Sequence, residues 1–381
     1  MPEVPLIRDS LKDIYANNLN SDHPTNKHAG LLLDRGFLKY DENQSTLKSD
    51  FINKLCQTES SSLYINEFIR WLNLTKDPQN PEKPSRFCQT LFSLENRLLI
   101  GLHGASALET GCMINHHNGM PYIPGSSVKG AVRHWARKHL SDELEKIWIK
   151  FFGSNPEDTD NDPFSGLVTF HDAWWVPNSA PTASSKASNK RTKSQPFINE
   201  IVTTHHLEYY SNEGDTKASD LDDPIPNALI GVHGSFLFTL EGEKPHTDIV
   251  KILLEKTLKE SGIGAKTSAG YGYFEDASND LKNRVAILIH SDNETNKEQS
   301  VSPALKYEVS QLRESKIIKM FSQDRGSTKK REDYEPLCKL IGEQFYELIS
   351  QWETETQKTS KNRFRAYGIL KDYLPEAKNN D

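Results

Sequence analysis

The stretch YIPGSSVKGAVRHWARK (Tyr122–Lys138) has the pattern of a loop that turns into a helix. The loop ends in a Pro-Gly pair, and Ser126 and Ser127 are expected to cap the helix that follows. Periodic apolar residues predict that this helix runs from about Ser126 to Leu140. Because a helix start with small residues and open backbone N–H groups attracts anions, the stretch predicts a phosphate-binding site.

The predicted helix has an apolar side and a basic flank. Its apolar residues at helical spacing are Val128, Ala131, Val132 and Trp135. Lys129, Arg133 and Arg137 recur every four residues and therefore line one flank. An ordinary solvated surface would account for such a flank by itself. A binding role is favoured for two reasons. No acidic residue occurs from Tyr122 to Ser141, and the helix start is open to an anion.

A second motif, GIGAKTSAGYGYF (Gly262–Phe274), places four glycines in eleven residues. A tight turn needs only one or two glycines, so this density indicates a backbone that passes close to another group. The motif is not a P-loop, because Ala265 separates Gly264 from Lys266. It is not a dinucleotide fingerprint either, because Thr267 stands where the third glycine belongs.

Apolar runs predict four strands and two helices around these motifs. The strands are expected at Asn96–Gly104, Ser165–Trp175, Gly231–Glu241 and Gly270–Glu275, and the helices at Ser126–Leu140 and His246–Gly262. The order β-α-β-β-α-β predicts an α+β fold with a ferredoxin-like (RRM-like) core and helical additions at both ends.

The first and fourth strands of such a sheet are neighbours, so the helix start and the glycine motif are expected to converge at one edge. A lysine-bearing glycine loop that faces a basic helix forms a groove for a polyanion. An extended RNA backbone suits this groove better than a single nucleotide, because the cations lie along a line.

Composition predicts three parts of the chain. Residues 1–90 are expected to form a helical and irregular extension, residues 91–277 the core, and residues 278–381 a helical C-terminal extension. Within the core, residues 177–196 (PNSAPTASSKASNKRTKSQP) are rich in Pro, Ser and Lys, which predicts a mobile insertion.

Length, charge and cysteine content limit the class of protein. The chain has 381 residues and a net charge of −7, which argues against a general basic coat but permits a local basic groove. Its four cysteines include no CxxC pair, so a zinc ribbon and a disulfide scaffold are not expected. The N-terminus MPEVPLIRDS lacks an apolar run, and no long apolar run follows. A cytoplasmic protein without membrane contact is expected.

Two histidine pairs, His116–His117 and His205–His206, are candidate metal ligands or catalytic groups. Neighbouring residues on a strand point to opposite faces, and no carboxylate occurs at a helical ligand spacing, so no metal or other cofactor is expected. His206 with Tyr209 and Tyr210 fits base stacking or packing better.

Several segments together resemble the RAMP superfamily. They are GLHGASALETG, HHNGMPYIPGSSVKGAVRHWA, FFGS, GLVTFHDAWW, IVTTHHLEYYSNEG with DPIPNALIGVHGSFLFTL, and GIGAKTSAGYGYF, and they lie between about residues 96 and 275. The pairing of PGSSVKG with a C-terminal glycine loop is typical of the superfamily. The HHLEYY and DPIP block is similar, within it, to the sixth Cmr subunits of type III-B CRISPR complexes.

This resemblance implies an RRM-like fold, crRNA binding near the crRNA 3′ end, and no catalytic role. The implied partners are crRNA, target RNA and other Cmr subunits in a hetero-oligomer. The motifs and the resemblance together indicate these RNA-binding residues: Gly125, Ser126, Ser127, Lys129, Gly130, Arg133, Arg137, His206, Tyr209, Gly262, Gly264, Lys266, Thr267, Ser268, Gly270 and Tyr271.

Two alternatives are compatible with the same sequence. One is a crRNA-processing endoribonuclease of the RAMP superfamily that uses a histidine such as His206 or His117. The other is a different RAMP backbone subunit, for example one of the Csm type.

Overall fold

The computed structural model describes residues 4–374 except 22, 24, 26, 41–45, 77–85, 104–107, 109, 155–162, 182–192, 205–216, 218, 220–224, 291–308, 323–334 and 355–358. The chain divides into two compact units, Met1–Asn283 and Arg284–Asp381. The first unit contains the central sheet, and the second is helical.

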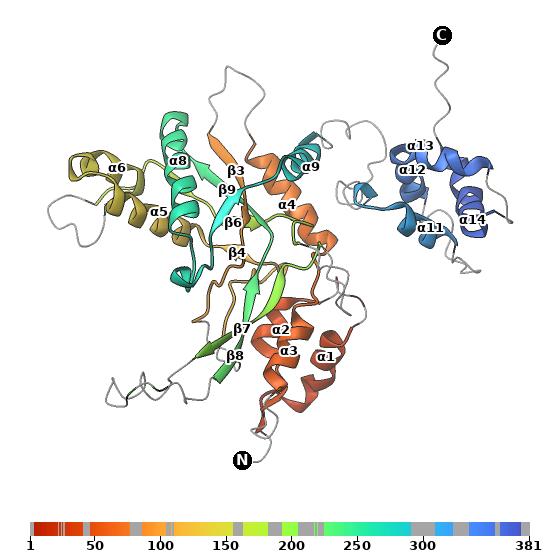
Figure 1. Ribbon diagram of the computed structural model, residues 1–381, viewed down its shortest axis with the longest axis horizontal. Coiled ribbons are helices and arrows are strands. Elements are labelled where there is room, and N and C mark those ends of the chain that lie inside the picture. Colours follow the sequence, from red (N-terminus) through yellow and green to blue (C-terminus); the bar gives the residue numbers. More distant parts are fainter. Residues whose placement is uncertain are drawn as a thin grey trace, which may run out of the picture. The chain divides into compact units, whose positions relative to one another are not determined.

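The central sheet has the strand order β10-β3-β9-β6-β4, and β5 pairs with β9 beside this path (Figure 1). Its strands are β3 (Phe87–Leu94), β4 (Tyr122–Ile123), β5 (Thr169–Phe170), β6 (Ala173–Trp175), β9 (Ser235–Glu241) and β10 (Phe274–Asp276). Neighbouring strands are antiparallel, and Phe274 at the start of β10 pairs with Leu94 at the end of β3.

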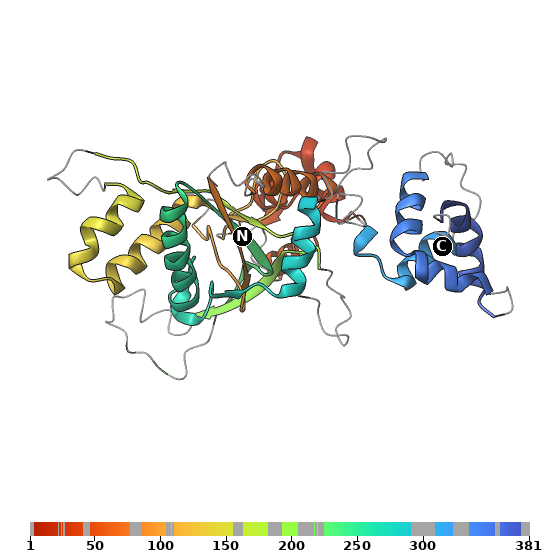
Figure 2. The same ribbon diagram turned by 90° about the horizontal axis from the view of Figure 1, so that it is seen from above.

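One face of the sheet is covered by helix α8 (Lys244–Glu260), with α5 (Gly125–His139) beside it (Figure 2). Four aromatic side chains of this face are almost fully buried: Phe92, Phe236, Phe238 and Phe274. Their rings pack edge to face, with centroids between 5.7 and 6.1 Å apart. This aromatic layer fixes α8 on the sheet.

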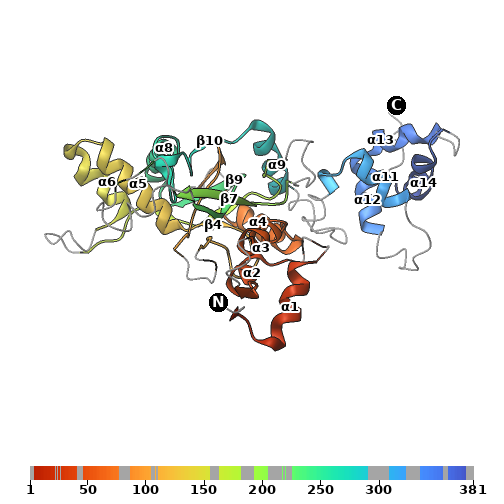
Figure 3. The ribbon, with the colours of Figure 1, turned by 60° about the horizontal axis from the view of Figure 1, so that its bottom comes forward.

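The opposite face is covered by helix α4 (Ser62–Leu74), as Figure 3 shows. Trp174 stacks against Tyr64 and Trp71 of α4, with ring centroids 6.0 and 6.1 Å apart. The Gln89 side-chain amide of β3 donates a hydrogen bond to the Leu72 carbonyl, 2.9 Å away. An RRM uses its open sheet face to stack bases, and α4 occupies that face here.

The other elements of the first unit surround this sandwich. They are β1 (Val4–Pro5), α1 (Asp9–Leu19), α2 (Ala29–Arg35), β2 (Lys39–Tyr40), α3 (Leu47–Leu55), the 3₁₀ helix η2 (Asp142–Leu144), α6 (Glu145–Phe152), β7 (Phe197–Thr204), β8 (Ile225–Val232) and the 3₁₀ helix η3 (Thr267–Ala269). Strands β7 and β8 form a separate two-stranded ribbon, and the Asn199 side chain of β7 donates hydrogen bonds to the side chains of Ser49 and Asn53 in α3.

The C-terminal unit has a hydrophobic core of its own. Helix α9 (Asn279–His290) spans the boundary between the units. The further elements are α11 (Glu314–Ser322), α12 (Glu335–Gln344), α13 (Tyr346–Ser350), α14 (Lys361–Leu370) and the 3₁₀ helices η5 (Gln351–Thr354) and η6 (Lys371–Tyr373). Their buried side chains include Ile317, Ile341, Ile349, Trp352 and Leu370.

The structure confirms the α+β class and both predicted core helices, each shifted by one or two residues. The predicted first strand at Asn96–Gly104 is wrong, because the strand is Phe87–Leu94. Within the wrongly assigned segment, Leu98 forms only an isolated bridge to Val232. The sequence of this segment resembles a strand because Leu98, Leu99 and Ile100 form an apolar run. These three side chains are buried in the structure although the segment is not a strand.

The other three strand predictions also need correction. The predicted third strand, Gly231–Glu241, is split, because Gly231 and Val232 end β8 and β9 begins at Ser235. The run Ser165–Trp175 forms two short strands, β5 and β6, and the predicted fourth strand begins only at Phe274. Most of the predicted mobile insertion, residues 182–192, lies outside the described residues. Its two ends meet, because the Ala180 N–H donates to the Lys193 carbonyl at 3.1 Å.

Candidate nucleic-acid interface

The four glycines of the loop between α8 and β10 all have positive φ. The angles are +68° at Gly262, +99° at Gly264, +88° at Gly270 and +74° at Gly272. Residues with a side chain rarely adopt this conformation, so each glycine has a local reason to be present. The predicted close passage of the backbone is confirmed at Gly264 and Gly272, and the groups approached are carbonyls of the protein itself.

The glycine loop closes on itself and on the segment after β3. The Ile263 N–H donates to the Gly272 carbonyl at 2.9 Å. The N–H groups of Ala265 and Gly272 donate to the carbonyls of Leu99 and Arg97, each at 2.7 Å. A Cβ at Gly264 would lie 2.5 Å from the Leu99 carbonyl oxygen. A side chain at Gly264 would therefore disturb the contact between the loop and Leu99.

Tyr271 anchors the same loop to the β7–β8 ribbon. Its hydroxyl donates to the Glu200 carboxylate at 2.8 Å, and Arg97 pairs with the same carboxylate at 2.7 Å. Burial, followed by the hydrogen bond with Glu200, raises the pKa of Tyr271. The Tyr271 hydroxyl thus stabilises the loop through its hydrogen bond to Glu200.

The start of α5 differs from its predicted form. The N-cap residue is Pro124, without a side-chain cap, so Ser126 and Ser127 lie inside the first turn and do not cap the helix. The Gly125 N–H donates to Asp172 Oδ1 at 2.7 Å. A Cβ at Gly125 would overlap the Phe170 carbonyl, so this glycine permits close packing on β5. A carboxylate of the protein already occupies the position at Gly125 that was expected to attract phosphate.

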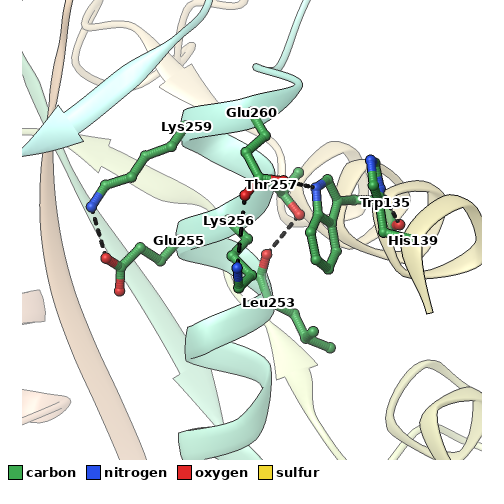
Figure 4. Close-up of polar contacts among 8 residues, drawn as sticks. All are labelled: Trp135, His139, Leu253, Glu255, Lys256, Thr257, Lys259 and Glu260. Carbon is green, nitrogen blue, oxygen red and sulfur yellow. Dashed lines mark hydrogen bonds and ion pairs between the residues drawn. The ribbon is translucent and has the colours of Figure 1, made fainter. Parts of the chain in front are cut away.

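Trp135 fixes α5 against α8, as Figure 4 shows. Its indole N–H donates to Glu260 Oε2 at 3.0 Å. The His139 ring stacks on the indole at 4.6 Å, and Lys256 Nζ lies 5.8 Å from the indole centroid. Because the glycine loop follows Glu260 directly, these contacts also set the distance between α5 and the loop.

A groove of about 850 Å³ lies between α5 and the glycine loop. On the helix side it is lined by Ser127, Ala131, His134 and Lys138; on the loop side it is lined by residues 260–265, Thr267 and Ser268; and residues 100–103 and Tyr273 complete it. The expected convergence of the helix and the loop at one edge is therefore present. We call this site the loop groove.

A second hollow, of about 170 Å³, lies next to the loop groove on α5 and is lined by Gly130, Arg133, His134 and Arg137. The predicted basic flank is thus divided, because Arg133 and Arg137 line this hollow whereas Lys129 lines neither site. His134 lines both, and the sequence reasoning missed it. The helical spacing from Ser127 through Ala131 to His134 and Lys138 could have identified it.

The remaining sequence candidates are less informative. His206 and Tyr209 lie outside the described residues. His116 and His117 lie in an exposed turn, and not on a strand. In the part of the chain that the structure describes, no group of three or more His, Cys, Asp or Glu side chains could hold a metal ion. Among the same residues, no helix combines the length and apolar character needed to cross a bilayer.

Both walls of the loop groove lie in a segment with a family match. A model of the RAMP superfamily matches residues 92–275. We call these residues the RAMP segment. It contains α5, α8, the glycine loop and most of the central sheet.

The chain also has named relatives. The chain is 26% identical to CRISPR system Cmr subunit Cmr6 of Pyrococcus furiosus, over 48% of this chain and 65% of the relative. It is 27% identical to CRISPR system CMR subunit Cmr6 of Saccharolobus solfataricus, over 47% of this chain and 54% of that relative. The chain therefore covers less than two thirds of either relative's length.

Solved structures give similar names. A crystal structure of Cmr6 from Pyrococcus furiosus has a TM-score of 0.28 and 24% identity, covering 50% of this chain and 98% of that one. A chain of the type III-B Cmr-beta complex bound to cognate target RNA has a TM-score of 0.43 and 18% identity, covering 71% of this chain and 87% of that one.

Proposed function

We propose that this chain is a Cmr6-type subunit of a cytoplasmic type III-B CRISPR complex and binds crRNA near its 3′ end without cleaving it. Its partners would be crRNA, target RNA and other Cmr subunits. The observation that carries the proposal is the loop groove, which lies in the RAMP segment and joins a basic helix to a glycine loop.

The strand order supports a finer description of the core. Strands β10, β3, β9 and β6 are the fourth, first, third and second strands of the β-α-β-β-α-β unit, with β5 and β6 together taken as its second strand. A ferredoxin-like sheet has this antiparallel order. We therefore treat residues 91–277 as a ferredoxin-like core, extended back to Phe87 where β3 begins, with the segments before and after it as additions. RNA binding is assigned to the edge of this core, because α4 covers the sheet face.

The groove offers groups that suit a phosphodiester backbone. Lys138 lines one wall, and the hydroxyls of Ser127, Thr267 and Ser268 can donate hydrogen bonds to phosphate oxygens. Lys266 is exposed in the same glycine loop, although it is not one of the residues that line the groove. Of the sequence candidates, Gly130, Arg133 and Arg137 would contact RNA in the second hollow.

Isolation of the full chain from its host would test the assembly. Copurification with other Cmr subunits and with RNA ending in the 3′ part of a spacer is expected, and mass spectrometry with RNA sequencing would identify both. A preparation that contains neither RNA nor Cmr subunits would contradict the proposal.

A cleavage assay separates this proposal from the endoribonuclease alternative. The isolated chain should leave labelled repeat RNA intact, with and without Mg²⁺. Specific cleavage that His117→Ala, His134→Ala or His206→Ala abolishes would show that the chain is the processing enzyme.

A further inference from the structure

Helix α14 of the C-terminal unit has a basic N-terminal half and lies outside the RAMP segment. Its sequence KNRFRAYGIL contains three cations and no acid. Ala366 and Leu370 are fully buried in the core of the unit. Lys361, Arg365 and Gly368 lie on the opposite, exposed side of the helix at helical spacing.

Apolar side chains flank this basic line. Phe364 is 40% exposed and Ile369 is 36% exposed. A single exposed apolar residue is ordinary, but an aromatic ring beside two cations is an arrangement with which proteins hold single-stranded nucleic acid. The cations attract the backbone, and the ring stacks on a base.

Gly368 adds an independent observation. A Cβ built on Gly368 would meet no atom within 4 Å. Packing therefore gives no reason for a glycine inside this helix, where alanine would be more favourable. The absent side chain leaves the helix backbone open to close approach by a ligand.

The acids of the C-terminal unit lie on elements other than α14. Arg363 of α14 pairs with Glu314 of α11 at 2.8 Å, and this ion pair links the two helices. Tyr367, on the inner side of α14, is near Glu353 of η5, and burial followed by this carboxylate raises the pKa of Tyr367. Other elements of the unit contain further acids, among them Glu343 of α12, Glu347 of α13 and Glu353 of η5.

We propose that the exposed face of α14, formed by Lys361, Phe364, Arg365 and Gly368, is a second binding site for single-stranded RNA. An acidic protein segment would use the two cations but not the flat ring or the open glycine, so the combination favours RNA. The site goes beyond the proposed function of the loop groove and does not depend on it.

Charge reversal in the full-length protein tests this site. Arg365→Glu is compared with Lys339→Glu, which makes a similar change at an exposed position of α12 in the same unit. Arg365→Glu should weaken binding of a labelled 20-nucleotide single-stranded RNA by about three- to tenfold at low salt, whereas Lys339→Glu should change it by less than about twofold.

Phe364→Ala tests the stacking contribution. It should weaken binding by about fivefold or more, and this loss should persist at high salt because stacking is not screened. Unchanged circular dichroism and thermal melting would show that the exposed substitutions leave the fold intact. Ultraviolet crosslinking with mass spectrometry should identify the peptide that contains Phe364.

The outcomes distinguish the two RNA sites. Equal effects of Arg365→Glu and Lys339→Glu on RNA affinity would show that α14 is not an RNA site. The proposal is also wrong if Arg365→Glu leaves RNA affinity unchanged but abolishes binding of an acidic protein, the alternative occupant of this face. Lys138→Glu reports on the loop groove in the same assay. A loss from Arg365→Glu alone supports α14 and contradicts the groove, and a loss from Lys138→Glu alone does the reverse.

Discussion

The glycine loop and helix α5 form the two walls of one groove, yet they are built in different ways. The loop wall consists of backbone held by backbone, with Gly264 and Gly272 in contact with neighbouring carbonyls. The helix wall consists of side chains, and Ser127, His134 and Lys138 are exposed on it. Substitutions in the loop should therefore change the fold, and substitutions on the helix should change binding.

The largest effect is expected from Gly272→Ala. A Cβ at Gly272 would overlap the Ile263 carbonyl, and φ is +74°, so the loop must open to accept it. We expect a loss of about 3 kcal/mol or more in the free energy of unfolding. Chemical denaturation of the full chain measures this value.

Gly270→Ala is the matched control for this substitution. Its φ is +88°, but its Cβ would meet no atom within 4 Å. Only the strain of positive φ should appear, at about 1–2 kcal/mol. Equal losses from the two variants would show that the loop is not held by the Ile263–Gly272 contact.

The second effect is expected on the helix wall, from Lys138→Glu. Lys138 lines the loop groove, whereas Lys129 lies on the same helix and lines neither hollow. Lys138→Glu should weaken RNA binding by about three- to tenfold and lower the salt dependence by about one phosphate contact. The fold-loss of RNA affinity from Lys129→Glu should be less than half of that from Lys138→Glu.

Filter binding at several salt concentrations measures both variants. Equal losses of RNA affinity from Lys138→Glu and Lys129→Glu would show that binding depends only on the net charge of α5. In that case the groove geometry would not determine binding.

The sequence predicted both walls because their signals are local. Helical periodicity located α5 and α8, and the density of glycine located the loop. The predictions failed where a distant residue decides the structure. Asp172, 47 positions away, occupies the N–H of Gly125, and Glu200, 71 positions away, holds Tyr271. No local sequence pattern indicates such long-range contacts. Ser126 and Ser127 were therefore expected to cap α5, although Asp172 accepts the hydrogen bond at the helix start.

The third effect concerns this cap. Asp172→Ala removes the acceptor of the Gly125 N–H and a carboxylate beside the helix start. We expect a loss of about 1 kcal/mol in the free energy of unfolding. RNA affinity should stay within about twofold, because Gly125 is buried. A marked rise in RNA affinity would instead mean that phosphate binds at the helix start once the carboxylate is gone.

The smallest effect, from Gly130→Ala, separates stability from binding on the helix wall. Gly130 lies inside α5, and a Cβ there would meet no atom within 4 Å. Alanine is more favourable than glycine inside a helix by about 1 kcal/mol, so the thermal midpoint should rise by about 2 °C. Gly130 also lines the hollow with Arg133 and Arg137, where the added methyl group would stand between RNA and the helix backbone.

RNA affinity of Gly130→Ala should therefore fall by about twofold while stability rises. Lys129→Ala, at the neighbouring position, is the control for a small change on α5 outside both hollows. Calorimetry and RNA titration of the same preparations give the two quantities. Opposite signs are the expected result, because only a ligand that approaches the helix backbone would lose from the added methyl group. If affinity is unchanged or rises with stability, RNA does not approach α5 at Gly130, and the second hollow is no part of the RNA path.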